Sequence, residues 1–519
     1  MSMEFHSGNA YIVFEKEIEH IKNAISSIIK PTLGYSSNAI KRRLVQQITE
    51  DCLGPYVTTL RKRFDNNKKI LPKNGVWLNC KKFNLQIGTG KVKIPIFQKI
   101  LSMISFYKLW TYNASLIIIG FIKYSKSSPA TLIFGIGLES LFKDGDDSNF
   151  VRFCRSSNIS PLMQGSKFII QFPSNKGENT DKKFSYMRRP IHSLFKQTNL
   201  GTIKNLKLLY KHLLLLYHFQ IAIIKVPLLS LIANELAYKT IVEIMDEEEY
   251  IEAIIFTNSN CTAQPLWMQA NQNFKTHMVW YSQNHKPFTY LRNQLHADIP
   301  SSRQMVFDVH WVWTVGFKNY LKYLGLTSEI NYVGPILWYL PHKHKIQTND
   351  NNIVITIFDI NPFSDEFALQ FGEFENYNRP KHLLKFISDI IKLKDKLEKS
   401  FKKTVIFKLK QKRGYNKVYD KDYFEFLDDL SDKGIIKNIQ YQENMFSLIS
   451  ESHVVIVFPY SSPAYAADYL KVPAIYYDPT KTLKPTYEET SYINFANTTE
   501  GLSCLVVDAI NRSKKNNED

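Results

Sequence analysis

The stretch His453-Val-Val-Ile-Val-Phe-Pro-Tyr-Ser-Ser-Pro-Ala-Tyr-Ala-Ala-Asp-Tyr-Leu-Lys-Val-Pro-Ala-Ile-Tyr-Tyr-Asp-Pro479 indicates how the C-terminal part of the chain folds. Its apolar run from Val454 to Phe458 contains no alternating polar residue, which is typical of a strand buried on both faces of a parallel sheet. Residues 464–470 predict a short helix, and residues 472–477 predict the next strand. The predicted unit is therefore a strand, a polar turn, a helix and a second strand.

The polar turn of this unit carries two serines, Ser461 and Ser462, directly before Pro463. A serine followed by proline is typical of a helix N-cap with proline at the first helical position. In an open parallel sheet such a turn lies at the carboxyl edge, where ligands bind, and hydroxyls with backbone N–H groups suit a phosphate. We interpret both serines as residues that bind the phosphate of a nucleotide-linked donor. The alternative is an ordinary helix cap.

The residues before this unit alternate regularly between strand and helix patterns. This alternation predicts an α/β domain with a doubly wound parallel sheet. We expect strands at residues 353–358, 403–410 and 435–441, and helices at residues 380–399, 422–430 and 444–450.

Polar side chains gather where these strands are predicted to end. Lys408, Lys410 and Arg413 lie at or beyond the second strand, and Glu443 follows the third. Basic groups facing the serine turn would neutralise a phosphate or a sugar carboxylate. The alternative for each lysine is a place on a lysine-rich surface loop.

The N-terminal half carries weaker signals of the same kind. A buried strand beginning at Ala130 would bring Glu139 near its carboxyl end, although a glutamate at a helix start is an alternative. Strands at 251–256 and 278–281 each end in a polar loop, and the second loop holds Asn284 and His285. Asn284 is a candidate for substrate binding. Glu139 and His285 are the candidate catalytic bases, since imidazole titrates near neutrality, and an ordinary surface histidine is the alternative.

These patterns divide the 519 residues into four parts. We expect a mainly helical extension at residues 1–125, a Rossmann-like domain at 126–341, a linker at 342–352 and a second Rossmann-like domain, which carries the serine turn, at 353–519. The fold class is α/β, with two Rossmann-type domains.

The composition limits the classes of protein to which this chain can belong. The five cysteines have no zinc-type or disulfide-framework spacing, no secretory signal opens the chain, and neither a metal site nor a cofactor is expected. The apolar stretches 114–122 and 217–233 are too short or too interrupted for confident membrane spans, so we expect core elements there. A net charge of +18 suggests a polyanionic partner, but no nucleic-acid-binding motif accompanies it. An anionic membrane surface is therefore expected rather than nucleic acid.

The stretch from Leu448 to Pro479 resembles the bacterial surface-polysaccharide biosynthesis proteins named for a PFTS motif, with Pro459-Tyr-Ser-Ser462 in place of Pro-Phe-Thr-Ser. Residues 358–363 and 333–338 also look like that family, so the resemblance covers about residues 250–485. The layout is similar to GT-B glycosyltransferases, including those that use CMP-activated acidic sugars. It also resembles the CDP-glycerol phosphotransferases of teichoic-acid synthesis. Those enzymes carry an Asp where Pro459 stands here, and this departure favours sugar transfer.

The resemblance implies a GT-B-like, metal-independent glycosyltransferase of lipopolysaccharide or capsule assembly that works in the cytoplasm, at the inner face of the plasma membrane as a peripheral protein. Its partners would be a nucleotide-sugar donor, such as a CMP-linked sugar, and a glycan or lipid-linked glycan acceptor. Residues 126–341 would then form the acceptor domain and residues 353–519 the nucleotide-sugar-binding domain. One alternative is a CDP-polyol phosphotransferase. The other is a non-enzymatic basic protein that binds nucleic acid or membranes, which the charge of +18 would suit.

Overall fold

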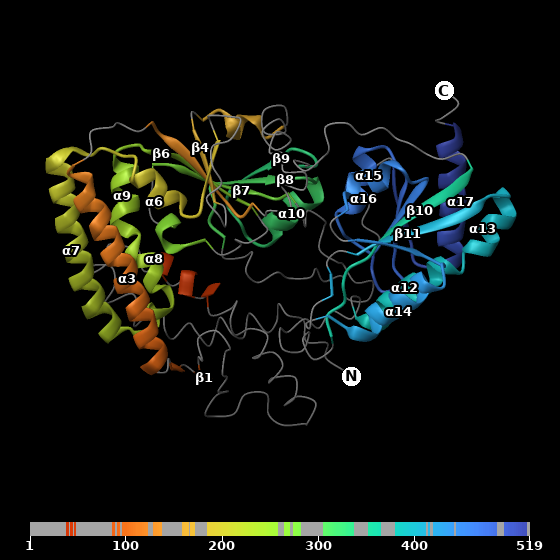
Figure 1. Ribbon diagram of the computed structural model, residues 1–519, viewed down its shortest axis with the longest axis horizontal. Helices are drawn as coiled ribbons and strands as arrows, with labels where there is room; N and C mark the ends of the chain where they lie inside the picture. The colour runs from red at the N-terminus through yellow and green to blue at the C-terminus, as the bar shows by residue number, and fades with distance from the viewer. Residues whose placement is uncertain are drawn as a thin grey trace.

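The computed structural model describes two α/β domains joined in one chain (Figure 1). The described residues are 38–40, 42–44, 46–47, 86–88, 91–93, 96–122, 128–136, 158–165, 167–171, 184–257, 264–269, 273–281, 305–336, 351–364, 379–411, 414–415, 419–440, 443–484 and 492–515.

The C-terminal domain is built on a six-stranded sheet in the order β12-β11-β10-β13-β14-β15, and every neighbouring pair is parallel. The strands are β10 (Asn352–Phe358), β11 (Thr404–Lys410), β12 (Lys437–Ile439), β13 (Val454–Val457), β14 (Ala474–Tyr477) and β15 (Ile493–Ala496). β13 and β14 are buried along their whole length, as expected for strands with helices on both faces. The predicted doubly wound sheet is confirmed, with a sixth strand, β15, that the sequence patterns did not indicate.

Helices cover both faces of this sheet, with α12 and α14 on one side and α15 and α16 on the other (Figure 1). They are α12 (Pro380–Ile391), α13 (Lys394–Phe401), α14 (Lys421–Asp432), α15 (Met445–Ser450), α16 (Pro463–Tyr469) and α17 (Thr499–Lys515). Side chains fix two of the helix starts. Asp420 accepts a hydrogen bond from the backbone N–H of Tyr423, and Asn444 accepts from Phe446 N–H.

The N-terminal domain has a seven-stranded parallel sheet in the order β5-β4-β3-β6-β7-β8-β9. Its strands are β3 (Ala130–Phe134), β4 (Phe168–Gln171), β5 (Phe184–Met187), β6 (Ile251–Thr257), β7 (Lys275–Val279), β8 (Val309–Val312) and β9 (Glu329–Tyr332). Its helices are α6 (Pro190–Phe195), α7 (Gly201–Lys225), α8 (Ala233–Ala237), α9 (Lys239–Glu247) and α10 (Val315–Tyr323). The short 3₁₀ helices are η1 (Ser160–Met163), η2 (Pro227–Ile232) and η3 (Leu266–Met268). The prediction of an α/β chain with two Rossmann-type domains is thus confirmed.

Two long helices lie side by side on the outer flank of the N-terminal domain, α7 and α3 (Ile96–Gly120), after a small hairpin of β1 (Gln86–Gly88) and β2 (Lys91–Lys93) (Figure 1). Phe106 of α3 stacks on Phe219 of α7 with ring centroids 3.7 Å apart. α3 therefore packs against the sheet domain that it precedes. Within the described part of the chain, no helix is both long and apolar enough to cross a membrane.

The two domains touch between segments that follow carboxyl strand ends. Trp313, just after β8, meets Tyr465 of α16 edge to face, with ring centroids 6.4 Å apart. Both aromatic rings belong to one buried cluster that also holds Val279 and Phe458. The carboxyl edges of the two sheets therefore approach each other at this contact.

Several element boundaries differ from those that the sequence patterns predict. β12 is three residues long, whereas a strand was expected at residues 435–441. α7 ends at Lys225 because Pro227 has no backbone N–H to donate to the helix, and the chain continues as η2, α8 and α9. The expected helix at 380–399 divides into α12 and α13 around Leu393.

Candidate functional site

The order of the C-terminal strands identifies where a ligand would bind. The chain runs outward from β10 through β11 to β12, returns to β13, and then runs outward in the other direction. The connections therefore diverge between β10 and β13, and in open α/β sheets ligands bind in the crevice outside the carboxyl ends of the strands at this point. The backbone N–H of Phe458 donates to the carbonyl of Phe358 at 2.9 Å, so the two strands stay paired up to that edge.

The motif Pro459-Tyr-Ser-Ser462 forms the turn that leaves β13 at this crevice. Two tyrosine hydroxyls anchor it, one from within the turn and one from β14. Tyr460 is buried and donates to the carbonyl of Lys484 at 2.6 Å, while Tyr476 of β14 donates to the carbonyl of Ser461 at 2.9 Å. The rings of Tyr460 and Tyr476 pack edge to face with centroids 5.2 Å apart. The turn is therefore held rigidly against β14 and the loop after it.

The two serines of the motif have different surroundings. Ser461 donates its hydroxyl to the carbonyl of Phe458 at 3.1 Å, so this side chain closes the turn itself. Ser462 is the N-cap residue and Pro463 is the first helical residue, as predicted. The Ser462 hydroxyl makes no capping hydrogen bond to α16, because its backbone is in the helical region rather than the extended one usual for a cap. Of the two, Ser462 is the one whose hydroxyl is open to a ligand, and its side chain is half-buried.

The two lysines predicted to bind the ligand, Lys408 and Lys410, also differ in their surroundings. Lys408 lies two residues before the end of β11 and forms a 2.5 Å ion pair with Glu451, at the end of α15. Lys410 is the last residue of β11, is buried, and lies in register with Phe358 of β10. Lys410 is therefore at the carboxyl edge, one strand from the crevice, whereas Lys408 is held on the face that α15 covers. Glu443 is exposed and lies between the edge strand β12 and α15, further from the crevice.

A buried carboxylate follows β10 at the same edge. Asp359 accepts a hydrogen bond from the hydroxyl of Tyr423 on α14. Burial, and then the charge of Asp359, raise the pKa of Tyr423 well above its usual value, so this hydroxyl remains a donor. The hydrogen bond fixes the position of the Asp359 carboxyl group beside the crevice.

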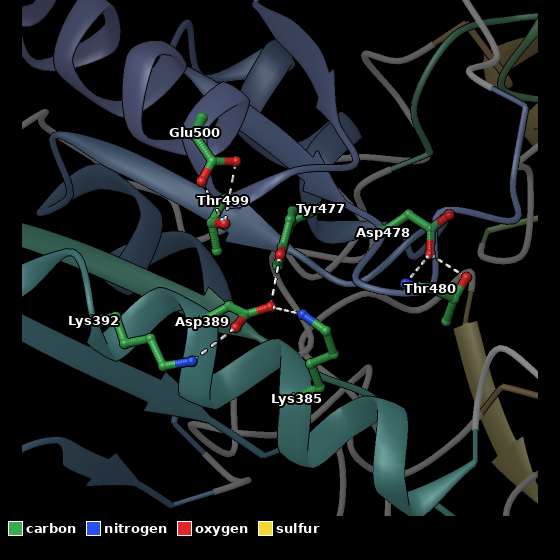
Figure 2. Close-up of polar contacts among 8 residues, drawn as sticks. All are labelled: Lys385, Asp389, Lys392, Tyr477, Asp478, Thr480, Thr499 and Glu500. Carbon is green, nitrogen blue, oxygen red and sulfur yellow. Dashed lines mark hydrogen bonds and ion pairs between the residues drawn. The ribbon is translucent and has the colours of Figure 1, made fainter.

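A second acidic residue at this edge, Asp478, was not among the sequence candidates. It follows β14, is buried, and accepts backbone hydrogen bonds from Thr480, Thr482 and Leu483, each at 2.9 Å. Figure 2 shows its contact with Thr480. Asp478 thereby shapes the loop whose far end, Lys484, binds Tyr460 of the motif. Its place directly after a predicted strand is a sequence signal that could have found it.

The neighbouring residue, Tyr477, points the other way, toward α12. Its hydroxyl donates to Asp389 at 2.8 Å, and Lys385 and Lys392 also contact that carboxylate (Figure 2). Burial opposes ionisation of Asp389, but the hydrogen bonds from Lys385 and Tyr477 outweigh it and lower its pKa overall. Burial and Asp389 raise the pKa of Tyr477 far above its usual value. This network joins β14 to α12 behind the site.

His382, near the start of α12, is a further titratable group at the carboxyl edge that the sequence patterns did not indicate. Burial, and then the positive charge of Lys381, lower its pKa, although the Asp478 carboxylate acts in the opposite direction. A half-buried neutral imidazole follows from this shift at neutral pH.

The N-terminal sheet diverges in the same way, between β3 and β6. At that point Thr257 donates its hydroxyl to the carbonyl of Gly135. Gly135 has φ +80°, and a Cβ there would lie 2.8 Å from the Thr257 hydroxyl oxygen. Only glycine fits this close approach without a shift of Thr257. The segment that follows β3 and the end of β6 therefore pack closely at the carboxyl edge of this sheet.

Four of the sequence candidates lie outside the described residues: Glu139, Asn284, His285 and Arg413. Their roles stay predictions. Among the residues that the structure describes, no cluster of three or more His, Cys, Asp or Glu side chains could hold a metal ion.

The fold and site define a class: a protein of two Rossmann-type domains with a rigid serine turn at the crevice of the second sheet. A family model described as "Polysaccharide biosynthesis PFTS motif protein" matches residues 217–506, more than half of the chain. The chain belongs to this family of polysaccharide biosynthesis proteins, as its motif predicted. No curated protein matches the sequence.

Several solved structures overlap the chain loosely. The wall teichoic acid polymerase TagF is 10% identical, over 82% of this chain and 91% of that one, with a TM-score of 0.40. The UDP-GlcNAc 2-epimerase from Methanocaldococcus jannaschii is 14% identical, over 74% of this chain and 92% of that one, with a TM-score of 0.36. The sucrose-phosphate synthase from Thermosynechococcus elongatus is 9% identical, over 75% of this chain and 91% of that one, with a TM-score of 0.38.

Proposed function

We propose that the protein is a glycosyltransferase of surface-polysaccharide biosynthesis that moves a sugar from a nucleotide donor to a glycan or lipid-linked glycan. The observation that carries the proposal is the position of the family motif. Its turn lies at the β10/β13 crevice of a Rossmann-type sheet, where such sheets bind nucleotides, and the Ser462 hydroxyl is not used as a helix cap.

In the proposed complex, the donor phosphate accepts a hydrogen bond from the Ser462 hydroxyl, and Lys410 and Arg413 supply positive charge. A cation placed near the bond that breaks stabilises the charge that develops on the leaving phosphate. Ser461 then has a supporting role, because its hydroxyl and carbonyl are used within the anchored turn. Lys408 would contribute indirectly, through the position of Glu451.

The N-terminal domain would present the acceptor to this donor, with His285 or Glu139 as the catalytic base and Asn284 as a substrate contact. The Trp313–Tyr465 contact supports this division of labour, since it brings the two carboxyl edges together. Replacing the true base, as His285→Asn or Glu139→Gln, should lower kcat by about 10²-fold to 10⁴-fold and leave donor affinity unchanged. The variant whose kcat does not fall identifies the residue that is not the base.

The donor is proposed to be CMP-linked and acidic, and the polymer to be lipopolysaccharide or capsule made at the inner face of the plasma membrane. A thermal-shift screen of the full chain with CMP, CDP, UDP, GDP and their sugar conjugates tests the donor class. A ligand at about 100 times its Kd adds roughly 2.7 kcal/mol of stability. Selective stabilisation by CMP supports the acidic-sugar donor, and stabilisation by UDP or GDP changes the nucleotide only.

Two other outcomes of this screen would overturn the proposal. Stabilisation by CDP, together with transfer of a polyol phosphate from a CDP-polyol, would assign polyol-phosphate transfer instead. No response to any nucleotide, with salt-sensitive retention on polyanions, would favour a non-enzymatic binding protein.

A further inference from the structure

The outer surfaces of α3 and α7 carry most of the large exposed hydrophobic side chains of the described residues. Eight lie on α3 or in the turn after it, and six lie on α7, against five among all the other described residues. Phe97 is 68% exposed and Ile203 is 83% exposed. A concentration of this size on one helix pair marks an interaction surface rather than scattered surface residues.

The exposed residues of α7 form a regular stripe. They are Ile203, Leu206, Tyr210, Leu213, Tyr217 and Ile224, spaced three, four or seven residues apart. The buried stripe, which includes Asn205, Leu208 and His212, has the same spacing but is offset by two residues. At 100° per residue this offset places the two stripes on nearly opposite sides of the helix. A surface helix needs only one apolar side to pack against its own domain. The apolar side chains on the opposite side of α7 are therefore available to contact another apolar environment.

α3 repeats the pattern and is joined rigidly to α7. Phe97, Leu101 and Ile104 are exposed near its start, and Ile118 and Ile122 are exposed near its end. The pair is antiparallel, because Phe106 of α3 stacks on Phe219 of α7, whereas Trp110, later in α3, contacts His212, earlier in α7. Trp110 donates to the carbonyl of His212 at 2.9 Å, and Asn113 donates to the carbonyl of Ala237 in α8 at 2.8 Å. The exposed apolar surfaces are thus held in place by the domain behind them.

The charge of the two helices identifies what this surface meets. α3 and α7 together contain six lysines and no acidic residue. Lys204 and Lys211 form ion pairs with Glu248 and Glu247 beside α9. The other four are Lys99, Lys108, Lys207 and Lys225, and none of them forms an ion pair with a residue that the structure describes.

We propose that the exposed surfaces of α3 and α7 dock the protein on an anionic lipid bilayer. Apolar side chains would enter the region between headgroups and acyl chains, while the lysines contact lipid phosphates. A second copy of the chain is a poorer partner, because the same surfaces facing each other would bring lysines against lysines. The proposal does not depend on the reaction proposed above.

Co-sedimentation of the full chain with vesicles tests this docking. We expect the protein to sediment with vesicles of equal parts phosphatidylcholine and phosphatidylglycerol, and to bind pure phosphatidylcholine more weakly. Replacing Leu213, Tyr217 and Ile224 by serine should weaken binding to the anionic vesicles by about tenfold or more, since apolar area is lost. The matched control replaces Val315, Tyr323 and Tyr332, which are exposed on or next to α10 and β9, and should bind as the unaltered protein does.

A charge variant separates the two components of binding. Lys207→Glu with Lys225→Glu should remove the preference for anionic vesicles, whereas Lys396→Glu with Lys399→Glu, exposed on α13, should keep it. Circular dichroism checks that every variant is folded. The proposal is wrong if the unaltered protein stays in the supernatant with anionic vesicles, or if the helix and control variants bind equally. It is also wrong if the serine variant converts a dimer to a monomer in sedimentation velocity without any change in vesicle binding.

Discussion

The hydroxyl of Tyr476 donates a hydrogen bond to the backbone carbonyl of Ser461 at 2.9 Å, and so ties β14 to the turn that carries the family motif. Tyr460 within the motif reaches the opposite way, to the carbonyl of Lys484. The turn is therefore positioned by side chains from both directions before any ligand arrives. Such preorganisation lowers the cost of ordering the site on binding.

Tyr476→Phe tests this anchoring. The substitution leaves the partly buried Ser461 carbonyl without its tyrosine donor, and it should lower the free energy of unfolding by about 1–3 kcal/mol. Urea unfolding measures the loss. Tyr469→Phe, on the exposed side of α16, is the matched control and should change stability by less than about 0.5 kcal/mol. Equal effects of the two substitutions would show that the hydrogen bond does not stabilise the turn.

Gly135→Ala should destabilise the N-terminal domain. Its Cβ would lie 2.8 Å from the hydroxyl oxygen of Thr257, and its φ of +80° disfavours any side chain. We expect a loss of about 1–3 kcal/mol in urea unfolding. Gly434→Ala is the control, because Gly434 has φ +66° but no atom within 4 Å of its Cβ position. It should show the backbone cost alone, and an equal loss at both positions would mean that the contact with Thr257 is unimportant.

Asp389 makes stability depend on pH. The pKa of Asp389 is lowered in the folded protein, so the folded state binds its proton less readily than the unfolded state. The stabilisation is therefore complete above the unfolded pKa of about 3.9 and is lost as the pH falls through the folded value. Asp389→Asn should lower the free energy of unfolding at neutral pH, and its difference from the unaltered protein should shrink at acidic pH. A difference that is the same at both pH values would contradict the lowered pKa.

The parallel C-terminal sheet could be predicted because its central strands are continuous apolar runs. Residues 454–457 and 474–477 are fully buried, and nothing in them alternates with polar residues. β15 was missed because its first three residues are only half-buried, as an edge strand allows, so the run Ile-Asn-Phe-Ala is not continuously apolar. β8 was missed for a similar reason, since His310 interrupts a short strand and is nevertheless buried.

The site could be predicted as far as the motif and its edge of the sheet. The separate roles of Ser461 and Ser462 could not, because they depend on backbone angles at the turn and on Tyr476, which lies 15 residues later. The same holds for the lysines. Lys408 and Lys410 look equivalent by alternation, but the ion pair of Lys408 with Glu451, 43 residues later, appears only in the folded chain.

The exposed stripe on α7 also escaped the sequence patterns. The stretches 114–122 and 217–233 were expected to be core because they are apolar. In the structure Leu116 and Ile117 are buried, yet Ile118, Ile119 and Ile224 are exposed. Apolar residues on two sides of one helix cannot be assigned to the core or the surface until the packing partner is known.

Ser462→Ala tests most directly whether the motif turn binds the donor phosphate. The measurement is isothermal titration calorimetry with the nucleotide that stabilises the protein most. Loss of one hydrogen bond to a charged phosphate costs about 1.5–3 kcal/mol, so Kd should rise by about tenfold to a hundredfold with stability unchanged. Ser447→Ala, exposed on α15, is the control and should bind normally. An unchanged Kd for Ser462→Ala would contradict the assignment of the motif turn as the site that holds the donor phosphate.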